Sequence, residues 1–244
     1  MIKMNFVNEF KGRELAFLHK DRKLPPKRGY NITNSNNLVE LKTILRLNKL
    51  KYNSYVTIAK YSEMPRFPIA PVKHWAEFKE WVKIRDQTIT AIDLMFDFDA
   101  TSTIQGIKRA WDDVTRAKYL LEILIGDDAK YLTTWFSGNK GFHILGKCKV
   151  VTTAQAIIDK QKDMAMQMEL ICPSIDTSIY DTARLRKLLG SYVYSKTFGR
   201  TRVIPVQDEQ EFKELIKALK HSDQEYFENK ELIRINNINL GVNK

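Results

Sequence analysis

Hydrophobic residues recur along the chain with two different periods, and each change of period marks a switch between strand and helix. The stretch Tyr52–Tyr61 is rich in β-branched and aromatic residues and predicts a strand. Apolar residues recur at helical spacing over Asn37–Lys49 and again from Trp75 onward. The first part of the chain, about residues 1–88, is therefore expected to form a small α/β unit.

The elements alternate more regularly from residue 89 onward. Strands are predicted at Ile89–Phe98, Tyr131–Phe136, Phe142–Val150 and Ile175–Tyr180, and helices at Thr103–Ile125 and Thr153–Ile171. This β-α-β-β-α-β order is that of a ferredoxin-like or RNA-recognition-like unit, in which the first strand lies between the third and the fourth. A short strand at Val203–Val206 and two polar helices from Asp208 onward follow. We therefore predict one α+β domain over residues 1–244, in which 89–206 is the RNA-recognition-like unit and 207–244 the C-terminal helices.

Composition and charge narrow the class of protein. Hydrophobic residues make up 43% of the chain, with 12 Phe, 10 Tyr and 4 Trp, which excludes disorder as the main state. The net charge is +11, and residues 1–90 hold 18 basic and 8 acidic residues against 22 and 21 in the remainder. This concentration favours a polyanion-binding face on the first part. Its centre is the Lys20–Gly29 loop, with Arg22, Lys23, Lys27 and Arg28.

Cysteine content and hydropathy exclude other classes. The two cysteines, Cys148 and Cys172, are too few for a disulfide framework or a cysteine-rich zinc site. An apolar run of about 18 residues, as a membrane span requires, does not occur in the sequence. The first residues also lack the apolar stretch of a signal peptide. We therefore expect a cytoplasmic protein without zinc and without a membrane partner.

Three aspartates are the first candidate site. Asp97 and Asp99 alternate along a predicted strand, so their side chains point to one face. The predicted topology places the strand with Asp176 beside them. Carboxylates this close repel unless a cation neutralises them, and magnesium or manganese prefers such oxygen ligands. The alternative is a pair of solvated acids at a strand end.

Two further segments offer groups that bind phosphate. The turn from Ser137 to His143, SGNKGFH, supplies free backbone amides, and Lys140 and His143 are its side-chain donors. An ordinary hairpin turn is the alternative. Residues 184–202 contain six basic residues and no acidic one, so this segment is a candidate for binding a triphosphate or a template backbone. Here the alternative is a basic surface loop.

In combination, these motifs resemble those of the archaeo-eukaryotic primase superfamily. The matching segments are Asp97-Phe-Asp99, Ser137-Gly-Asn-Lys-Gly-Phe-His143, Ile175-Asp176 and RLRKLLGSYVYSKT from Arg184 to Thr197, followed by Val203-Ile-Pro-Val. Near the N-terminus, Arg13-Glu-Leu-Ala-Phe17, Arg28-Gly-Tyr30 and Tyr52-Asn-Ser-Tyr55 are similar to the opening of primase small subunits. The resemblance covers about residues 6–206.

The resemblance implies a role for each matching residue. Asp97, Asp99 and Asp176 would be catalytic and bind two Mg²⁺ or Mn²⁺ ions. Contacts to the nucleotide would come from Ser137, Lys140, His143, Arg184 or Arg186, Ser191 and Lys196. Arg13 would join the basic loop in binding nucleic acid. The implied fold packs the N-terminal α/β unit on the RNA-recognition-like unit, with the active site in the cleft between them.

The implied activity is template-directed nucleotidyl transfer, in which NTPs or dNTPs make or extend primers on single-stranded DNA. A regulatory large subunit or a helicase is a further candidate partner. Two other functions stay open. One is a repair-type gap-filling polymerase of the same superfamily, and the other is a non-catalytic nucleic-acid-binding module.

Overall fold

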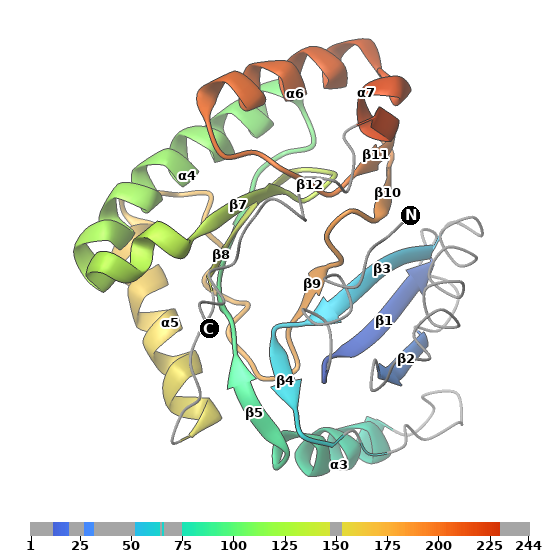
Figure 1. Ribbon diagram of the computed structural model, residues 1–244, viewed down its shortest axis with the longest axis vertical. Coiled ribbons are helices and arrows are strands. Elements are labelled where there is room, and N and C mark those ends of the chain that lie inside the picture. The colour runs from blue at the N-terminus through green and yellow to red at the C-terminus, as the bar shows by residue number, and fades with distance from the viewer. Residues whose placement is uncertain are drawn as a thin grey trace, which may run out of the picture.

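The computed structural model describes residues 12–19, 27–31, 52–63, 65, 75–146 and 153–229. Figure 1 shows two layers of strands with helices α4, α5 and α6 on one outer side. These helices lie beside the sheet that contains β7 and β8, and the sheet of β1, β2 and β3 lies on its other side. The predicted helix over 37–49 falls outside the described residues. The mixture of antiparallel sheets and helices confirms the α+β class.

The N-terminal sheet combines segments that are far apart in the sequence. Its order is β2-β1-β3-β9, from Lys27–Asn31, Glu14–His19, Tyr52–Thr57 and Leu185–Lys187. The strand β9 belongs to the basic run after Asp176, and it pairs antiparallel with β3. The segment that follows the third aspartate is therefore anchored in the N-terminal sheet.

Two predicted strands are each divided between sheets. The stretch Tyr52–Tyr61 separates at Ile58 into β3 and β4 (Ala59–Tyr61), and Ile89–Phe98 separates at Asp93 into β5 (Ile89–Ile92) and β6 (Leu94–Asp99). The two breaks face each other, because the Asp93 amide donates to the Ile58 carbonyl at 3.0 Å. Strands β4 and β5 then pair with each other in a sheet of their own.

The central sheet positions the aspartates. Its order is β12-β7-β8-β6, where β12 is Ile204–Pro205, β7 Thr133–Phe136 and β8 Gly141–Gly146. On the other edge of β6, Phe98 forms an isolated antiparallel bridge with Ile175. The strand predicted over Ile175–Tyr180 is therefore wrong beyond this bridge. The Asp176 side chain accepts hydrogen bonds from the backbone and hydroxyl of Ser178, a local turn that competes with strand pairing.

Helices cover the outer face of this sheet. Helix α4 spans Ile104–Ile125 and helix α5 spans Ala154–Glu169, and Thr103 and Thr153 cap their N-termini, which confirms both predicted helices. The sequence also predicted the helices α3 (Trp75–Asp86), α6 (Glu209–His221) and α7 (Gln224–Asn229). A 3₁₀ helix over Gly126–Tyr131 delays the start of β7 to Thr133.

Side chains along β6 point alternately to the core and to the opposite face of the sheet. Phe96 and Phe98 are fully buried in a core cluster with residues of α4, α5 and α6. Asp97 and Asp99 therefore occupy the opposite face.

After β9, the chain forms the hairpin of β10 (Tyr192–Ser195) and β11 (Gly199–Arg202). Among the described residues, no helix is long and apolar enough to cross a membrane.

Candidate active site

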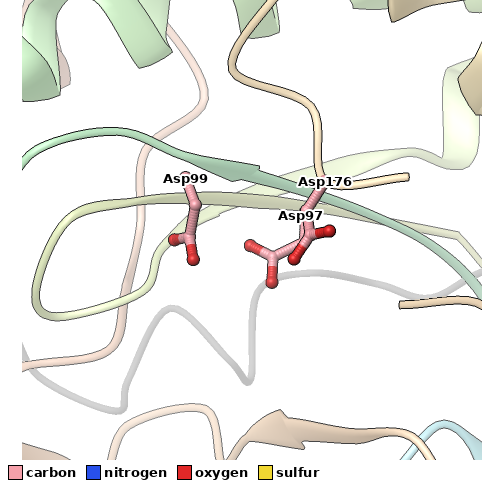
Figure 2. A group of neighbouring side chains, drawn as sticks. All are labelled: Asp97, Asp99 and Asp176. Atoms are coloured by element: carbon pink, nitrogen blue, oxygen red, sulfur yellow. The ribbon is translucent and has the colours of Figure 1, made fainter. Parts of the chain in front are cut away.

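The three predicted aspartates lie together in the structure. Each offers a carboxylate oxygen, and these atoms all lie within 4.8 Å of one another. Figure 2 shows Asp97 and Asp99 on β6 and Asp176 on the neighbouring segment, with the three carboxylates on the same side. The Asp176 amide donates to the Asp97 carbonyl at 2.8 Å, which holds the two backbones side by side.

The electrostatics of this cluster favour a cation. Burial raises the pKa of Asp97, and nearby Asp176 raises it further. Burial also raises the pKa of Asp99, to which Asp97 contributes. The Oδ1 atom of Asp97 is buried without a hydrogen-bond partner among the described residues. An oxygen-only donor set with an unused buried oxygen fits a hard divalent ion such as Mg²⁺ or Mn²⁺.

Two cationic side chains lie against the carboxylates. The Lys140 ammonium is 2.6 Å from Oδ2 of Asp99, and the Arg184 guanidinium is 3.2 Å from Oδ2 of Asp97. Lys140 comes from the turn between β7 and β8, whereas Arg184 immediately precedes β9. The structure thus places both predicted phosphate ligands at the edge of the acidic cluster.

His143 and Ser137 complete the group. His143 lies directly opposite Asp97 in the β6–β8 register, with its Nε2 atom 3.4 Å from Oδ1 of Asp97. Burial, followed by the charge of Lys187, lowers the pKa of His143 to about 3, so the imidazole is neutral at physiological pH. The Nδ1 atom of His143 and the Oγ atom of Ser137 are buried without hydrogen-bond partners among the described residues.

Two glycines allow the β7–β8 turn to lie close to β6. A Cβ atom on Gly141 would be 1.7 Å from the Phe98 carbonyl oxygen. Gly138 has a φ of +79°, and a Cβ there would be 2.7 Å from the Val193 side chain. The Ala100 amide also donates to the Lys140 carbonyl at 3.1 Å. This tight path brings the Lys140 side chain to Asp99.

The remaining predicted nucleotide contacts have different surroundings. Arg186 is 1% exposed, with its guanidinium 4.0 Å from Oδ2 of Asp93. Ser191 is buried, and its hydroxyl donates to the Leu188 carbonyl at 2.6 Å. Lys196 is exposed in the turn between β10 and β11. Their contacts with a nucleotide stay predictions of the resemblance.

The predicted nucleic-acid contacts divide into two sets. Arg13 is buried and binds the carbonyls of Thr57 and Ile58 and, at 2.6 Å, the carboxylate of Asp93. It therefore lies in the interior and not on the basic surface that the sequence suggested. Arg22 and Lys23 fall outside the described residues. Lys27 and Arg28 lie on β2, and their side chains are not described.

Sequence reasoning missed Tyr180 near the cluster and included Lys187 only as a member of the basic run 184–202. The charge of Lys187 acts on both Asp97 and His143. The Tyr180 hydroxyl is buried without a hydrogen-bond partner among the described residues. Burial raises the pKa of Tyr180, and Asp97 and Asp176 raise it further. Sequence position was the available signal, because Tyr180 lies four residues after Asp176 and Lys187 lies in the basic run.

Comparison with known proteins gives a structural match. No protein-family model and no curated protein matches the sequence. The polymerase domain of Mycobacterium tuberculosis Ligase D, solved in complex with DNA, superposes with a TM-score of 0.54 at 14% identity, over 94% of this chain and 86% of that domain. The chain therefore shares the fold of this polymerase domain.

Two further structures match at lower scores. The AEP domain of the cyanophage S-2L primase-polymerase gives a TM-score of 0.45 at 12% identity, covering 77% of this chain and 78% of that one. The primase RepB′ gives 0.46 at 9% identity, covering 96% of this chain and 66% of that one.

Proposed function

We propose that this chain is a template-directed nucleotidyltransferase that makes or extends primers on single-stranded DNA. The observation that carries the proposal is the cluster of the buried Asp97 with the partly buried Asp99 and Asp176, which has Lys140 and Arg184 at its edge. The matching fold of the Ligase D polymerase domain, which was solved with DNA, supports the same class of reaction. A purely nucleic-acid-binding module has no use for buried acids, because they repel phosphate.

Metal binding is part of this proposal. Asp97, Asp99 and Asp176 would hold two Mg²⁺ or Mn²⁺ ions. When bound, such ions lower the pKa of an attacking hydroxyl and stabilise the charge that develops on a leaving pyrophosphate. The raised pKa values of Asp97 and Asp99 mean that protons compete with metal for these oxygens.

The surrounding side chains would bind the nucleotide. The basic side chains of Lys140 and Arg184 lie beside the carboxylates, so they are placed to bind the phosphate oxygens of a triphosphate. A neutral His143 has one donor and one acceptor nitrogen, and Ser137 adds a hydroxyl. These groups would fix the orientation of the triphosphate for in-line attack.

We further propose that the substrate binds between the N-terminal sheet and the central sheet. The Arg184 side chain contacts Asp97 on β6, while the next residues form β9 within the N-terminal sheet. One short segment therefore joins the carboxylates to the opposite layer. The basic loop with Arg22, Lys23, Lys27 and Arg28 would bind the template backbone at this layer.

The decisive experiment compares Asp97→Ala and Asp99→Ala with the wild-type protein. Single-stranded template, labelled NTP or dNTP and either Mg²⁺ or Mn²⁺ are supplied, with and without a primer. We expect each variant to lose about 10³-fold or more of its nucleotidyl transfer, because its metal ligand is gone. Binding of the single-stranded template, measured by fluorescence anisotropy, should stay within about twofold.

A matched control and two readouts separate the alternatives. Asp112→Ala removes an exposed acid from α4 and should keep full activity. Synthesis without a primer identifies a primase, whereas synthesis only at a primed gap identifies a gap-filling polymerase. Full activity of Asp97→Ala and Asp99→Ala would refute the proposed site. Template binding without any synthesis or metal uptake by the wild-type protein would identify a binding module.

A further inference from the structure

A fourth acidic residue lies behind the acidic cluster and does not contribute to it. The buried residues of α4, all within the described part of the chain, are apolar except for Asp113. Asp113 is 4% exposed. A carboxylate in such a place is costly unless its hydrogen bonds are made. Its partners therefore indicate what it does.

The Asp113 carboxylate holds the segment that carries Asp176. Its Oδ2 atom accepts a hydrogen bond from the Ser174 backbone amide at 2.8 Å. The Asp113 carbonyl also accepts from Sγ of Cys172 at 3.4 Å. Both partners belong to the turn between α5 and Asp176. Helix α4 is thus joined to this turn by a side-chain and a backbone contact of one residue.

The same turn is joined to β6 on its other side. The Ser174 carbonyl accepts from the Asp99 amide at 2.8 Å, and the Asp176 amide donates to the Asp97 carbonyl at 2.8 Å. Ser174 therefore lies between Asp113 and the backbone of Asp99. The segment with Asp176 contacts β6 through these bonds and the isolated Phe98–Ile175 bridge, and Asp176 itself lies outside the strands.

An ion pair fixes the Asp113 carboxylate itself. Its Oδ1 atom is 2.8 Å from the Arg116 guanidinium, which also donates to the Ile171 carbonyl at 3.0 Å. The two oxygens thus serve different partners, Arg116 at the surface and Ser174 inside. This arrangement orients Oδ2 toward the Ser174 amide.

We propose that Asp113 is a positioning residue that sets where Asp176 lies relative to Asp97 and Asp99, and so sets metal affinity. The inference rests on the proposed metal site. Asp97 and Asp99 are held by regular pairing of β6 with β8, whereas Asp176 depends on the turn that Asp113 ties to α4. Groups that orient metal ligands from behind commonly change metal affinity 10- to 100-fold when they are removed.

The test is a titration of the full chain with Mn²⁺ alone, followed by electron paramagnetic resonance, for wild type, Asp113→Ala, Asp113→Asn and Asp112→Ala. We expect Asp113→Ala to bind Mn²⁺ about tenfold more weakly or worse. Asp113→Asn keeps an acceptor for the Ser174 amide but loses the ion pair with Arg116, so its affinity should fall only about threefold. Asp112→Ala, which removes an exposed acid from the same helix, should match the wild type.

Hydrogen exchange gives an independent readout. Amides of residues 172–178 should exchange faster in Asp113→Ala, while those of β7 and β8 stay protected. If Asp113→Ala does not fold, Asp113→Asn carries the test through its smaller loss of affinity and its faster exchange in 172–178. Wild-type affinity in the folded Asp113 variants would overturn the inference.

A further pair of variants keeps the two proposals apart. Asp97→Ala and Asp176→Ala should both weaken Mn²⁺ binding if the metal site is correct. Their loss of affinity beside unchanged binding by Asp113→Ala would overturn the positioning role alone. Unchanged Mn²⁺ binding in Asp97→Ala and Asp176→Ala would overturn the metal site, and the role of Asp113 with it.

Discussion

Two groups of charged residues, which come within four residues of each other in the sequence at Asp93 and Asp97, have different surroundings in the folded protein. In the first, the paired network, the Arg85 guanidinium is 2.8 Å from the Glu14 carboxylate, and both side chains are fully buried. Arg13 pairs with Asp93 at 2.6 Å in the same region. In the second, the acidic cluster, Asp97 and Asp99 lie side by side with raised pKa values.

The ion pairs of the paired network join different elements of the fold, whereas the acidic cluster brings like charges together on one side of β6. Glu14 lies on β1 and Arg85 on α3, and the Arg85 guanidinium also lies over the rings of Tyr61 and Trp81 at 5.1 and 5.0 Å. Each charge there meets an opposite charge inside the protein. Carboxylates gathered at Asp97 instead stay costly to ionise, which is the pattern of functional sites. The contrast separates charges that hold the fold from charges that serve a ligand.

The largest expected effect comes from breaking the paired network. In Arg85→Met, Glu14 loses the buried guanidinium that lies 2.8 Å from its carboxylate. We expect the free energy of unfolding to fall by about 3–5 kcal/mol. Urea denaturation followed by circular dichroism measures it. A loss below about 1 kcal/mol would mean that this network does not hold the fold.

A smaller effect of opposite sign is expected in the acidic cluster. Asp97→Asn removes a carboxylate whose ionisation is unfavourable in the folded protein. Without added metal at neutral pH, we expect the variant to be more stable, by about 1 kcal/mol, while losing activity. Thermal unfolding with a chelator present measures the change, and Asp112→Asn on the exposed face of α4 is the control.

The same pair of proteins gives a prediction for pH. Because the folded pKa of Asp97 is raised, its penalty is absent below the unfolded carboxyl pKa of about 3.9, grows as the pH rises above that value, and is complete above the folded pKa. The stability advantage of Asp97→Asn should therefore disappear in acid and be larger at neutral pH than below the unfolded pKa. An advantage that grows on acidification would contradict the raised pKa.

The smallest effect on stability is expected at Arg184. Its side chain is 29% exposed, and without it Asp97 can take up a proton instead of remaining an unpaired charge. We expect Arg184→Gln to lower the free energy of unfolding by less than about 1 kcal/mol. If Arg184 binds the triphosphate, the nucleotide KM should rise about tenfold or more. Denaturation and steady-state kinetics on one preparation compare the two effects with those of Arg85→Met.

Periodicity was a reliable guide where one element buries one face. Helices α4 and α5 were predicted from their apolar spacing, which is a local property, and the structure adds that Thr103 and Thr153 cap them. Asp97 and Asp99 were placed on one strand face for the same reason. Asp176 was brought to them by the order of elements, which the bridge to Phe98 supports although the predicted strand is absent.

Local sequence patterns did not predict which residues pair when they lie far apart in the sequence. The breaks at Ile58 and Asp93 occur where a hydrogen bond and the Arg13 guanidinium join residues more than thirty positions apart. Arg13 looked like a surface cation because a buried arginine and an exposed one have the same sequence signature. Only its partners distinguish them.

Local chemistry in the amino-acid sequence was sufficient to name the acids, the glycine turn and the helix ends of this protein. Their spacing follows from strand and helix geometry, which each segment carries within itself. Only the tertiary structure determined which charges are paired with each other. Asp93 and Asp97 are four residues apart in one hydrophobic stretch, yet Asp93 meets the buried Arg13, which precedes β1, whereas Asp97 meets the partly exposed Arg184 and two further carboxylates. Burial and the identity of distant neighbours set the cost of a charge, and both arise when the sheets assemble.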